Sequence, residues 1–212
     1  MKQHHMTYPS DIPEDPGFVL IIREIPAGTI FPIHWHDFLE FEIIVSGRGE
    51  HIYNGSAYTV TKDCAYLMCY NDFHGLTATT DMKLYSIHFS KSLLHPELAD
   101  FLEFNKFRCR FTPAETEEIV QKLLQMDDEL KNGLPFHDII VKNLIADIMI
   151  RAIRKSTNEK IHEAPPPIQK AVAYINANFH QNLTLADLAR EICFSPNYLG
   201  QLFKTETGMT FN

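Results

Sequence analysis

The stretch GTIFPIHWHDFLEFEIIVSG, Gly28–Gly47, carries the side chains that decide how this sequence is interpreted. His34, His36 and Glu40 all stand at even positions, and residues of equal parity share one face of a regular strand. We therefore expect the three side chains to point the same way from one strand. Two imidazoles and a carboxylate suit a divalent metal ion such as Zn, Fe, Mn or Ni.

A further histidine, His74, follows the apolar run CAYLMCY at 64–70 and is the fourth candidate ligand. The residue types alone leave three interpretations of this group. It is a metal centre, a polar pocket for a small molecule without a metal, or a cluster of structural histidines. Other candidates for the lining of the same pocket are Arg23, His51, Tyr53, Tyr66, Tyr85 and His88.

Short strand-like runs surround this stretch between residues 18 and 89. The run FVLIIREI at 18–25 is rich in β-branched and aromatic residues. Asn54-Gly55 predicts a tight hairpin turn, because both positions tolerate positive φ. Further strands are expected at 64–70 and 83–90. Many short strands at this spacing predict an antiparallel sandwich or a small barrel.

The hydrophobic period changes after residue 111 and indicates two helices. Thr112 followed by Pro113 and then Glu115 is a helix start, with a side-chain cap and a first-turn proline. Gly133 breaks this helix, and a second one follows with its own apolar stripe. We expect their wide apolar faces to be buried against the β-domain, against each other or against a second subunit.

Composition fits an ordinary globular protein of 212 residues with 45% hydrophobic residues and a net charge of -8. The charge argues against general polyanion binding. No apolar run is long enough to cross a bilayer, and the polar N-terminus has no signal-peptide core. We therefore expect a cytoplasmic protein without a membrane partner. The four cysteines form no pairing or zinc pattern and are expected to be buried thiols.

A polar and then proline-rich segment, STNEKIHEAPPP at 156–167, reads as a linker to an all-helical segment. There Thr184 and Asp187 form a capping box, and Ser195 with Pro196 starts the next helix after a short turn. A helix, a short turn and a second helix make the geometry that inserts the second helix into a DNA major groove.

The exposed face of that second helix offers candidate DNA contacts. Asn197 and Gln201 are four residues apart, and both side-chain types can pair bidentately with adenine. Tyr198 and Lys204 can contact phosphates. A merely solvated helix face is the alternative. The candidate DNA-binding residues are Ser195, Asn197, Tyr198, Gln201 and Lys204.

Residues 171–211, AVAYINANFHQNLTLADLAREICFSPNYLGQLFKTETGMTF, resemble the first half of the DNA-binding domain of AraC/XylS-type bacterial transcription regulators. The resemblance implies two helix-turn-helix units joined by a long helix. The second unit would begin beyond Asn212, so we expect a truncated chain. One unit offers few contacts and should bind operator DNA poorly.

The opening stretch resembles the first cupin motif, with Gly28, His34, His36, Glu40 and Gly47 at its spacing. The second motif is imperfect, because the usual Pro-x-Gly is missing where Cys64 follows Asp63. The two resemblances together imply a cupin-like domain that senses a small molecule, often a sugar. They also imply that the helices after it mediate dimerisation.

The sequence as a whole thus predicts an α+β protein in four parts. A cupin-like antiparallel β-barrel is expected at 1–111, a helical dimerisation or packing segment at 112–156, a linker at 157–167, and a partial helix-turn-helix domain at 168–212. The predicted function is a homodimeric transcription regulator that responds to a small polar effector, a saccharide, and binds promoter DNA. The alternative is a metal-dependent cupin enzyme, a dioxygenase or an isomerase.

Overall fold

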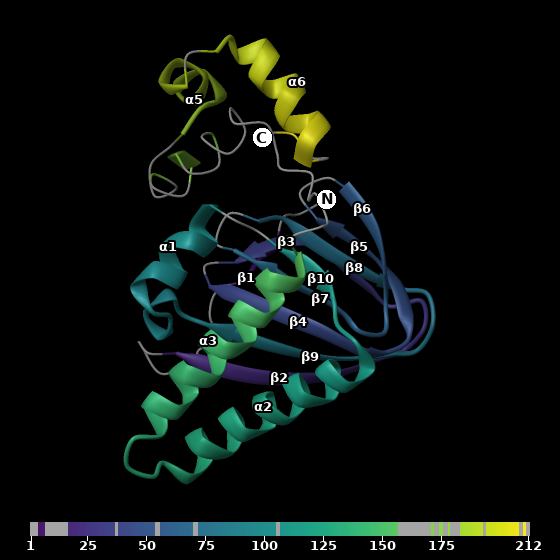
Figure 1. Ribbon diagram of the computed structural model, residues 1–212. Coiled ribbons are helices and arrows are strands. Elements are labelled where there is room, and N and C mark those ends of the chain that lie inside the picture. The colour runs from purple at the N-terminus through teal and green to yellow at the C-terminus, as the bar shows by residue number, and fades with distance from the viewer. Residues whose placement is uncertain are drawn as a thin grey trace.

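The computed structural model describes most of the chain and shows two layers of strands flanked by helices (Figure 1). The described residues are 4–6, 17–36, 38–53, 56–69, 72–104, 107–156, 171, 174–175, 178, 183–192, 194–207 and 210. The expected Asn54-Gly55 turn, the linker at 157–167, Cys193 and the expected C-cap Gly208 lie outside them.

Two five-stranded sheets form the cupin-like β-sandwich that the sequence predicts. Neighbouring strands pair antiparallel, except for β1 and β3, which pair parallel. The first sheet has the order β1 (His4–Met6), β3 (Ile30–His36), β8 (His74–Ala78), β5 (Arg48–Tyr53) and β6 (Ser56–Thr61). The second has the order β10 (Arg108–Arg110), β7 (Cys64–Met68), β4 (Leu39–Ser46), β9 (Met82–Phe89) and β2 (Phe18–Ile25).

Strand β4 lies at the centre of the second sheet and is buried on both faces from Leu39 to Ile44. Phe41 and Ile43 belong to the larger apolar core, which also contains residues of the helices. Ile44 belongs to a separate core between the two sheets, and Glu40 and Glu42 share its parity. Because side chains alternate along a strand, one strand supplies both the apolar core and the polar interior.

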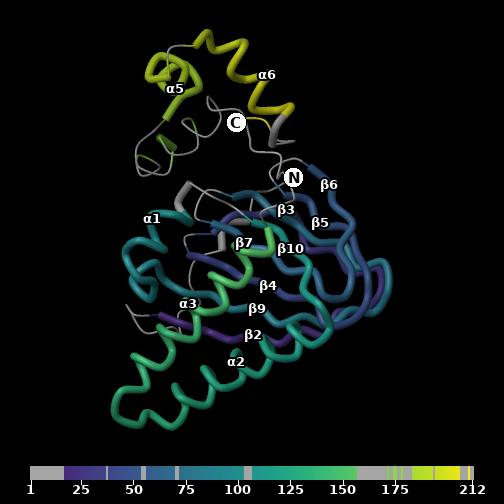
Figure 2. The backbone as a smooth tube through the Cα atoms, viewed as in Figure 1, coloured from purple at the N-terminus to yellow at the C-terminus, as the bar shows by residue number. Residues whose placement is uncertain are grey.

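Two long helices, α2 (Pro113–Asn132) and α3 (His137–Ser156), cover the outer face of the second sheet (Figures 1 and 2). The predicted start of α2 is confirmed, because Thr112 and Glu115 form a reciprocal capping box. Gly133 ends the helix in the left-handed conformation, with φ of 58°. The main apolar stripes of both helices are therefore buried within their own domain.

Three elements between the strands and α2 were not expected from the sequence. They are the short η1 (Lys91–Leu93), the helix α1 (Pro96–Phe104) and the edge strand β10. Cys64, Cys69 and Cys109 are buried, as predicted. Among the described residues, none of the helices combines the length and apolar character that spanning a bilayer requires.

The expected helix-turn-helix is formed by α5 (Leu185–Glu191) and α6 (Pro196–Thr207). Thr184 and Asp187 make the predicted capping box. The inner faces of the two helices meet in a small apolar core, separate from the two cores of the β-domain. Its buried members are Ala171, Leu188, Ala189, Leu199 and Phe203.

The glycine that closes the cupin-like motif has a clear steric reason. Gly47 lies between β4 and β5 with φ of 87°, a value that side chains disfavour. A Cβ atom there would also lie 2.2 Å from the carbonyl oxygen of Asp81. The sharp turn that sends β5 into the other sheet therefore requires glycine.

Candidate functional site

The expectation of one strand from Gly28 to Gly47 is wrong. One strand ends at His36 and the next begins at Leu39. His34 and His36 therefore lie on β3 of the first sheet, and Glu40 lies on β4 of the second. Equal parity on a single strand therefore does not bring these residues together. They meet because the two sheets face each other. The inward side chains of β3 and of β4 therefore point into the interior between the sheets.

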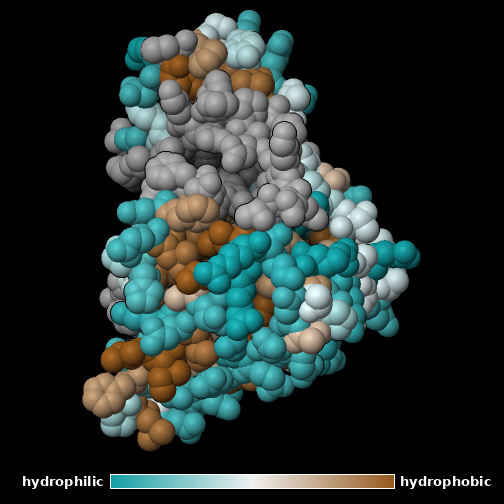
Figure 3. All heavy atoms as spheres, in the orientation of Figure 1, coloured by the Kyte–Doolittle hydropathy of each residue, from teal (hydrophilic) through white to brown (hydrophobic). Residues whose placement is uncertain are grey.

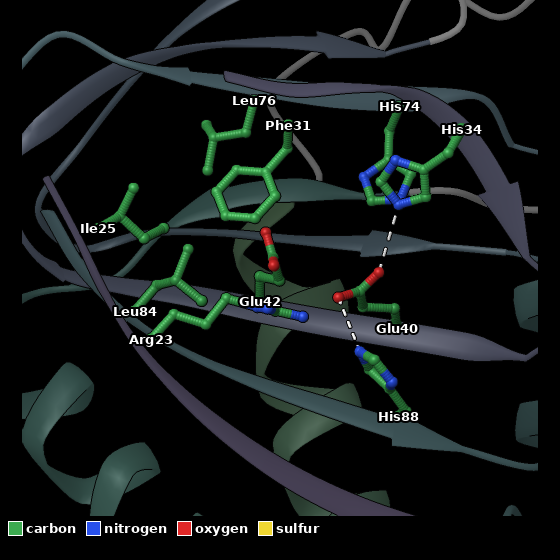
Figure 4. Close-up of a pocket in the computed structure, with 10 residues that line it drawn as sticks. All are labelled: Arg23, Ile25, Phe31, His34, Glu40, Glu42, His74, Leu76, Leu84 and His88. Atoms are coloured by element: carbon green, nitrogen blue, oxygen red, sulfur yellow. Dashed lines mark hydrogen bonds and ion pairs between the residues drawn. The ribbon is translucent and has the colours of Figure 1, made fainter. Parts of the chain in front are cut away.

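Glu40 makes most of the polar contacts of the site between the two sheets (Figure 4). Its Oε2 lies 3.1 Å from His36 Nε2 and 3.5 Å from His74 Nε2. Its Oε1 lies 2.9 Å from His88 Nε2 and accepts a hydrogen bond of 2.8 Å from Ser86 Oγ. All five side chains are buried. A single carboxylate thus gathers imidazoles from three strands.

The backbone fixes which nitrogen of two histidines faces Glu40. The Nδ1–H of His34 donates to the carbonyl oxygen of Pro32, and that of His36 donates to the carbonyl of Phe38, each at 2.8 Å. A carbonyl only accepts, so Nδ1 of each ring carries a proton, and Nε2 is the nitrogen left for other partners. Nε2 of His36 and of His74 is buried without a hydrogen-bond partner within the described ranges.

The surroundings of His34, His74 and Glu40 shift their pKa values toward the protonation states that bind metal ions. Burial lowers the pKa of His34 and, more strongly, the pKa of His74, which favours their neutral forms. Burial alone would raise the pKa of Glu40, but the contacts with His36 and His88 outweigh it and hold that pKa well below its usual value. Neutral imidazoles beside an ionised carboxylate are the forms that bind metal ions.

Three of the four predicted ligands converge on one point. His34, Glu40 and His74 each offer a ligand atom, and these atoms lie within 4.8 Å of one another. His36 adjoins the set through its contact with Glu40. His74 reaches the cluster although the second cupin motif is imperfect. The centre of its ring lies 4.2 Å from the centre of the His34 ring.

A cavity of about 50 Å³ opens beside the cluster (Figure 4). One end is polar and contains the cluster together with Glu42, whose pKa burial and the nearby charge of Glu40 raise to about 8. The other end is apolar apart from the half-buried Arg23, whose guanidinium lies 5.6 Å from the centre of the Phe31 ring. The lining residues are Arg23, Ile25, Phe31, His34, Glu40, Glu42, His74, Leu76, Leu84 and His88.

The other predicted lining residues divide between two places. His51, Tyr53 and Tyr66 line a second cavity of about 10 Å³ next to the first sheet's interior. Tyr85 instead packs against the apolar core beneath the helices. Trp35 does not line the main cavity, so the aromatic wall there is Phe31.

Two supporting residues were missed by sequence reasoning. Phe38 stacks between His36 and His88, with ring centres 4.2 and 4.4 Å away. Ser86 fixes Glu40 from the neighbouring strand. The pairing of Glu40 with His88 and of Glu42 with Ser86 depends on the register of β4 with β9. No local motif signals that register.

The candidate DNA-binding residues lie on the outer side of α6. All five are exposed, whereas Leu199 and Phe203 on the same helix are buried. Ser195 Oγ accepts a hydrogen bond from the backbone N–H of Tyr198, as expected of a helix cap. Tyr198 also stacks on Phe194, with ring centres 5.4 Å apart.

A cupin-like barrel with a buried polar cavity, joined to a helix-turn-helix, defines a class of ligand-binding transcription regulators. Residues 16–146 match the family described as the AraC-like ligand binding domain. Residues 175–212 match the bacterial regulatory helix-turn-helix proteins of the AraC family. The chain therefore belongs to the AraC family of transcription regulators, and it is not the metal-dependent enzyme that was the alternative.

Individual relatives agree with this assignment. The HTH-type transcriptional activator RhaR of Mannheimia succiniciproducens is 24% identical over 185 residues, which are 85% of this chain and 67% of that protein. The activator RhaS of Yersinia pestis is 37% identical over 61 residues, which are 29% of this chain and 22% of that protein.

Among solved structures, ToxT of Vibrio cholerae O395 superposes with a TM-score of 0.54 at 13% identity, covering 92% of this chain and 76% of that one. At this identity the likeness shows a shared fold. Another ToxT structure contains a bound unsaturated fatty acid. Proteins of the AraC family bind promoter DNA and small-molecule effectors.

Proposed function

We propose that the barrel interior holds a divalent metal ion beside a small polar effector, and that their binding controls how the helix-turn-helix unit meets promoter DNA. The observation that carries this proposal is the meeting of His34, His74 and Glu40 at one buried point. Membership of the family implies that the response is a change in transcription. The cavity beside the cluster is the proposed effector-binding site.

The donor set fits a metal ion. His36 Nε2 and Glu40 Oε2 lie 3.1 Å apart in a buried site, and such a contact is favourable only when a proton or a cation lies between the two atoms. The Nδ1 contacts of His34 and His36 with backbone carbonyls are the support that metal-ligating histidines usually have. Zn, Fe, Mn and Ni all accept imidazole and carboxylate ligands.

For the effector we propose a saccharide. Arg23 and Glu42 would provide polar contacts and Phe31 an aromatic wall. The cavity of about 50 Å³ admits only a few water-sized groups, well below the roughly 300 Å³ of ordinary small-molecule sites. A sugar therefore requires the apolar end, at Ile25, Phe31 and Leu84, to open when it binds.

We also propose that the protein acts as a homodimer through the turn between α2 and α3. The main stripes of both helices are already buried in their own domain, so a dimer has to use other residues. Apolar side chains gather at the turn (Figure 3), where Phe136 is 72% exposed. The exposed apolar residues there are Leu130, Leu134, Phe136 and Ile139.

Metal analysis of protein purified without a histidine tag tests the proposal. We expect about one equivalent of a divalent transition metal in the wild type and a large loss in His34→Ala. A wild-type protein without metal would remove the metal from the proposal. A sugar panel tested by thermal shift addresses the saccharide separately, and no shift with any sugar would rule that class out.

Sedimentation of the protein tests the dimer. Replacing Phe136 by Ser should shift the sedimentation coefficient from that of a dimer to that of a monomer, because it removes the most exposed apolar side chain at the turn. A wild-type monomer at high protein concentration would contradict the dimer without affecting the metal site.

A further inference from the structure

The β-domain contributes one described aromatic side chain to the core of the helix-turn-helix. Phe73, in the loop between β7 and β8, packs against the cluster formed by Leu188, Leu199 and Phe203. Figures 1 and 2 place α5 and α6 beyond one end of the barrel. The contact therefore joins the two halves of the molecule through an apolar side chain.

The loop that carries Phe73 is tied firmly to the barrel. Asp72 is fully buried, and its Oδ2 accepts hydrogen bonds from Tyr53 Oη at 2.6 Å and from the backbone N–H of Cys69 at 2.7 Å. The N–H of Asp72 in turn donates to the carbonyl of Cys69. These bonds hold Asp72, the residue before Phe73, to the packed interior of the barrel, and packed interiors transmit strain.

The next residue in the chain is His74, a candidate ligand. It opens β8, where its register neighbours are His34 on β3 and Tyr53 on β5. Its imidazole lies 3.5 Å from Glu40. One peptide bond therefore separates a residue that touches the helix-turn-helix core from a residue that would contact the bound metal.

The contact leaves the DNA-binding side of the second helix uncovered. Phe73 packs against the buried cluster to which Leu199 and Phe203 of α6 belong, while Gln201 and Lys204 on the same helix are exposed. Docking of this kind does not mask the DNA-binding surface. It fixes the orientation in which that surface is presented.

We propose that the loop at Asp72–His74 is an intramolecular docking point for the helix-turn-helix unit, with Phe73 as its anchor. Occupation of the barrel site moves His74 and thereby changes the hold of Phe73 on α5 and α6. The docking stands on the packing alone, whereas its response to binding rests on the proposed metal site.

Hydrogen exchange of the intact chain tests the docking without any ligand. In Phe73→Ala we expect amides of α5 and α6 to exchange about tenfold faster, because their core loses an aromatic contact. Amides of β4 should keep their wild-type rates. Phe73→Leu, which keeps an apolar anchor, should restore most of the protection, and Phe101→Ala, a partly exposed phenylalanine on α1 outside this core, should leave it unchanged.

Zinc addition then tests the coupling. Exchange in α5 and α6 should change with zinc in the wild type and not in Phe73→Ala, although both bind zinc equally well. Equal exchange of the wild type and Phe73→Ala without zinc would overturn the docking. An equal zinc response in both proteins would overturn the coupling. A wild type that binds no zinc would refute the metal proposal and the coupling, and the zinc-free comparison would still decide the docking.

Discussion

The two faces of β4 contrast sharply in chemistry, although their residues alternate along one short strand. Phe41 and Ile43 point outward into an apolar core shared with α2 and α3. Glu40 and Glu42 point inward, where buried carboxylates and imidazoles surround a cavity. The outer face contributes stability through apolar burial, and the inner face places charge in a costly environment. The difference indicates that the outer face of the strand serves folding, and it motivates our proposal that the inner face serves binding.

The largest effect should come from the outer face. Phe41→Ala removes a fully buried ring and should lower the free energy of unfolding by about 3 to 5 kcal/mol. Glu40→Gln, on the neighbouring inward position, should lower it less, because the isosteric amide leaves no void and its oxygen can still accept the hydrogen bond from Ser86. Urea denaturation of both variants gives the comparison, and a larger loss in Glu40→Gln would contradict it.

The inner face should instead control how stability depends on pH. Burial lowers the pKa of His51 from 6.5 to about 3. The unfolded chain therefore binds a proton on His51 before the folded one does, so this contribution is complete above pH 6.5 and is lost as pH falls toward 3. Its share is about 2 kcal/mol between pH 6.5 and pH 5, at about 1.4 kcal/mol for each pH unit.

His51→Phe, which retains a ring to stack on Tyr66 at 4.1 Å, should remove that share of the pH dependence. Urea midpoints of both proteins at pH 7 and pH 5 measure it. The idea fails if the two proteins lose the same free energy of unfolding between these pH values.

The same division of faces recurs on α6, with a smaller expected effect. Leu199 and Phe203 are buried, whereas Gln201 and Lys204 are exposed. Gln201→Ala should weaken binding to the protein's own promoter by about 1 kcal/mol and relax its sequence preference. Lys204→Ala should weaken binding to all sequences alike and reduce the salt dependence. Fluorescence anisotropy with matched and scrambled DNA separates the two, and identical behaviour of the variants would argue against the assignment.

The sequence predicted more of this fold than of the site's geometry. Capping-box and periodicity signals are local, and most elements follow from them, as the box at Thr112 illustrates. The candidate ligands His34, Glu40 and His74 do come together, but not along a single strand as expected, since His34 and Glu40 lie on different sheets. The roles of Ser86 and Phe73 depend on strand register and on packing between distant segments. No local pattern carries that information.

Zinc titration by calorimetry tests most directly whether the inner face of β4 is a binding surface. We predict one zinc ion per chain in the wild type, binding at least about 100-fold weaker in Glu40→Gln, and wild-type affinity in Glu50→Gln, whose carboxylate is exposed on β5. Binding that is absent from the wild type, or equally tight in Glu40→Gln, would contradict the account.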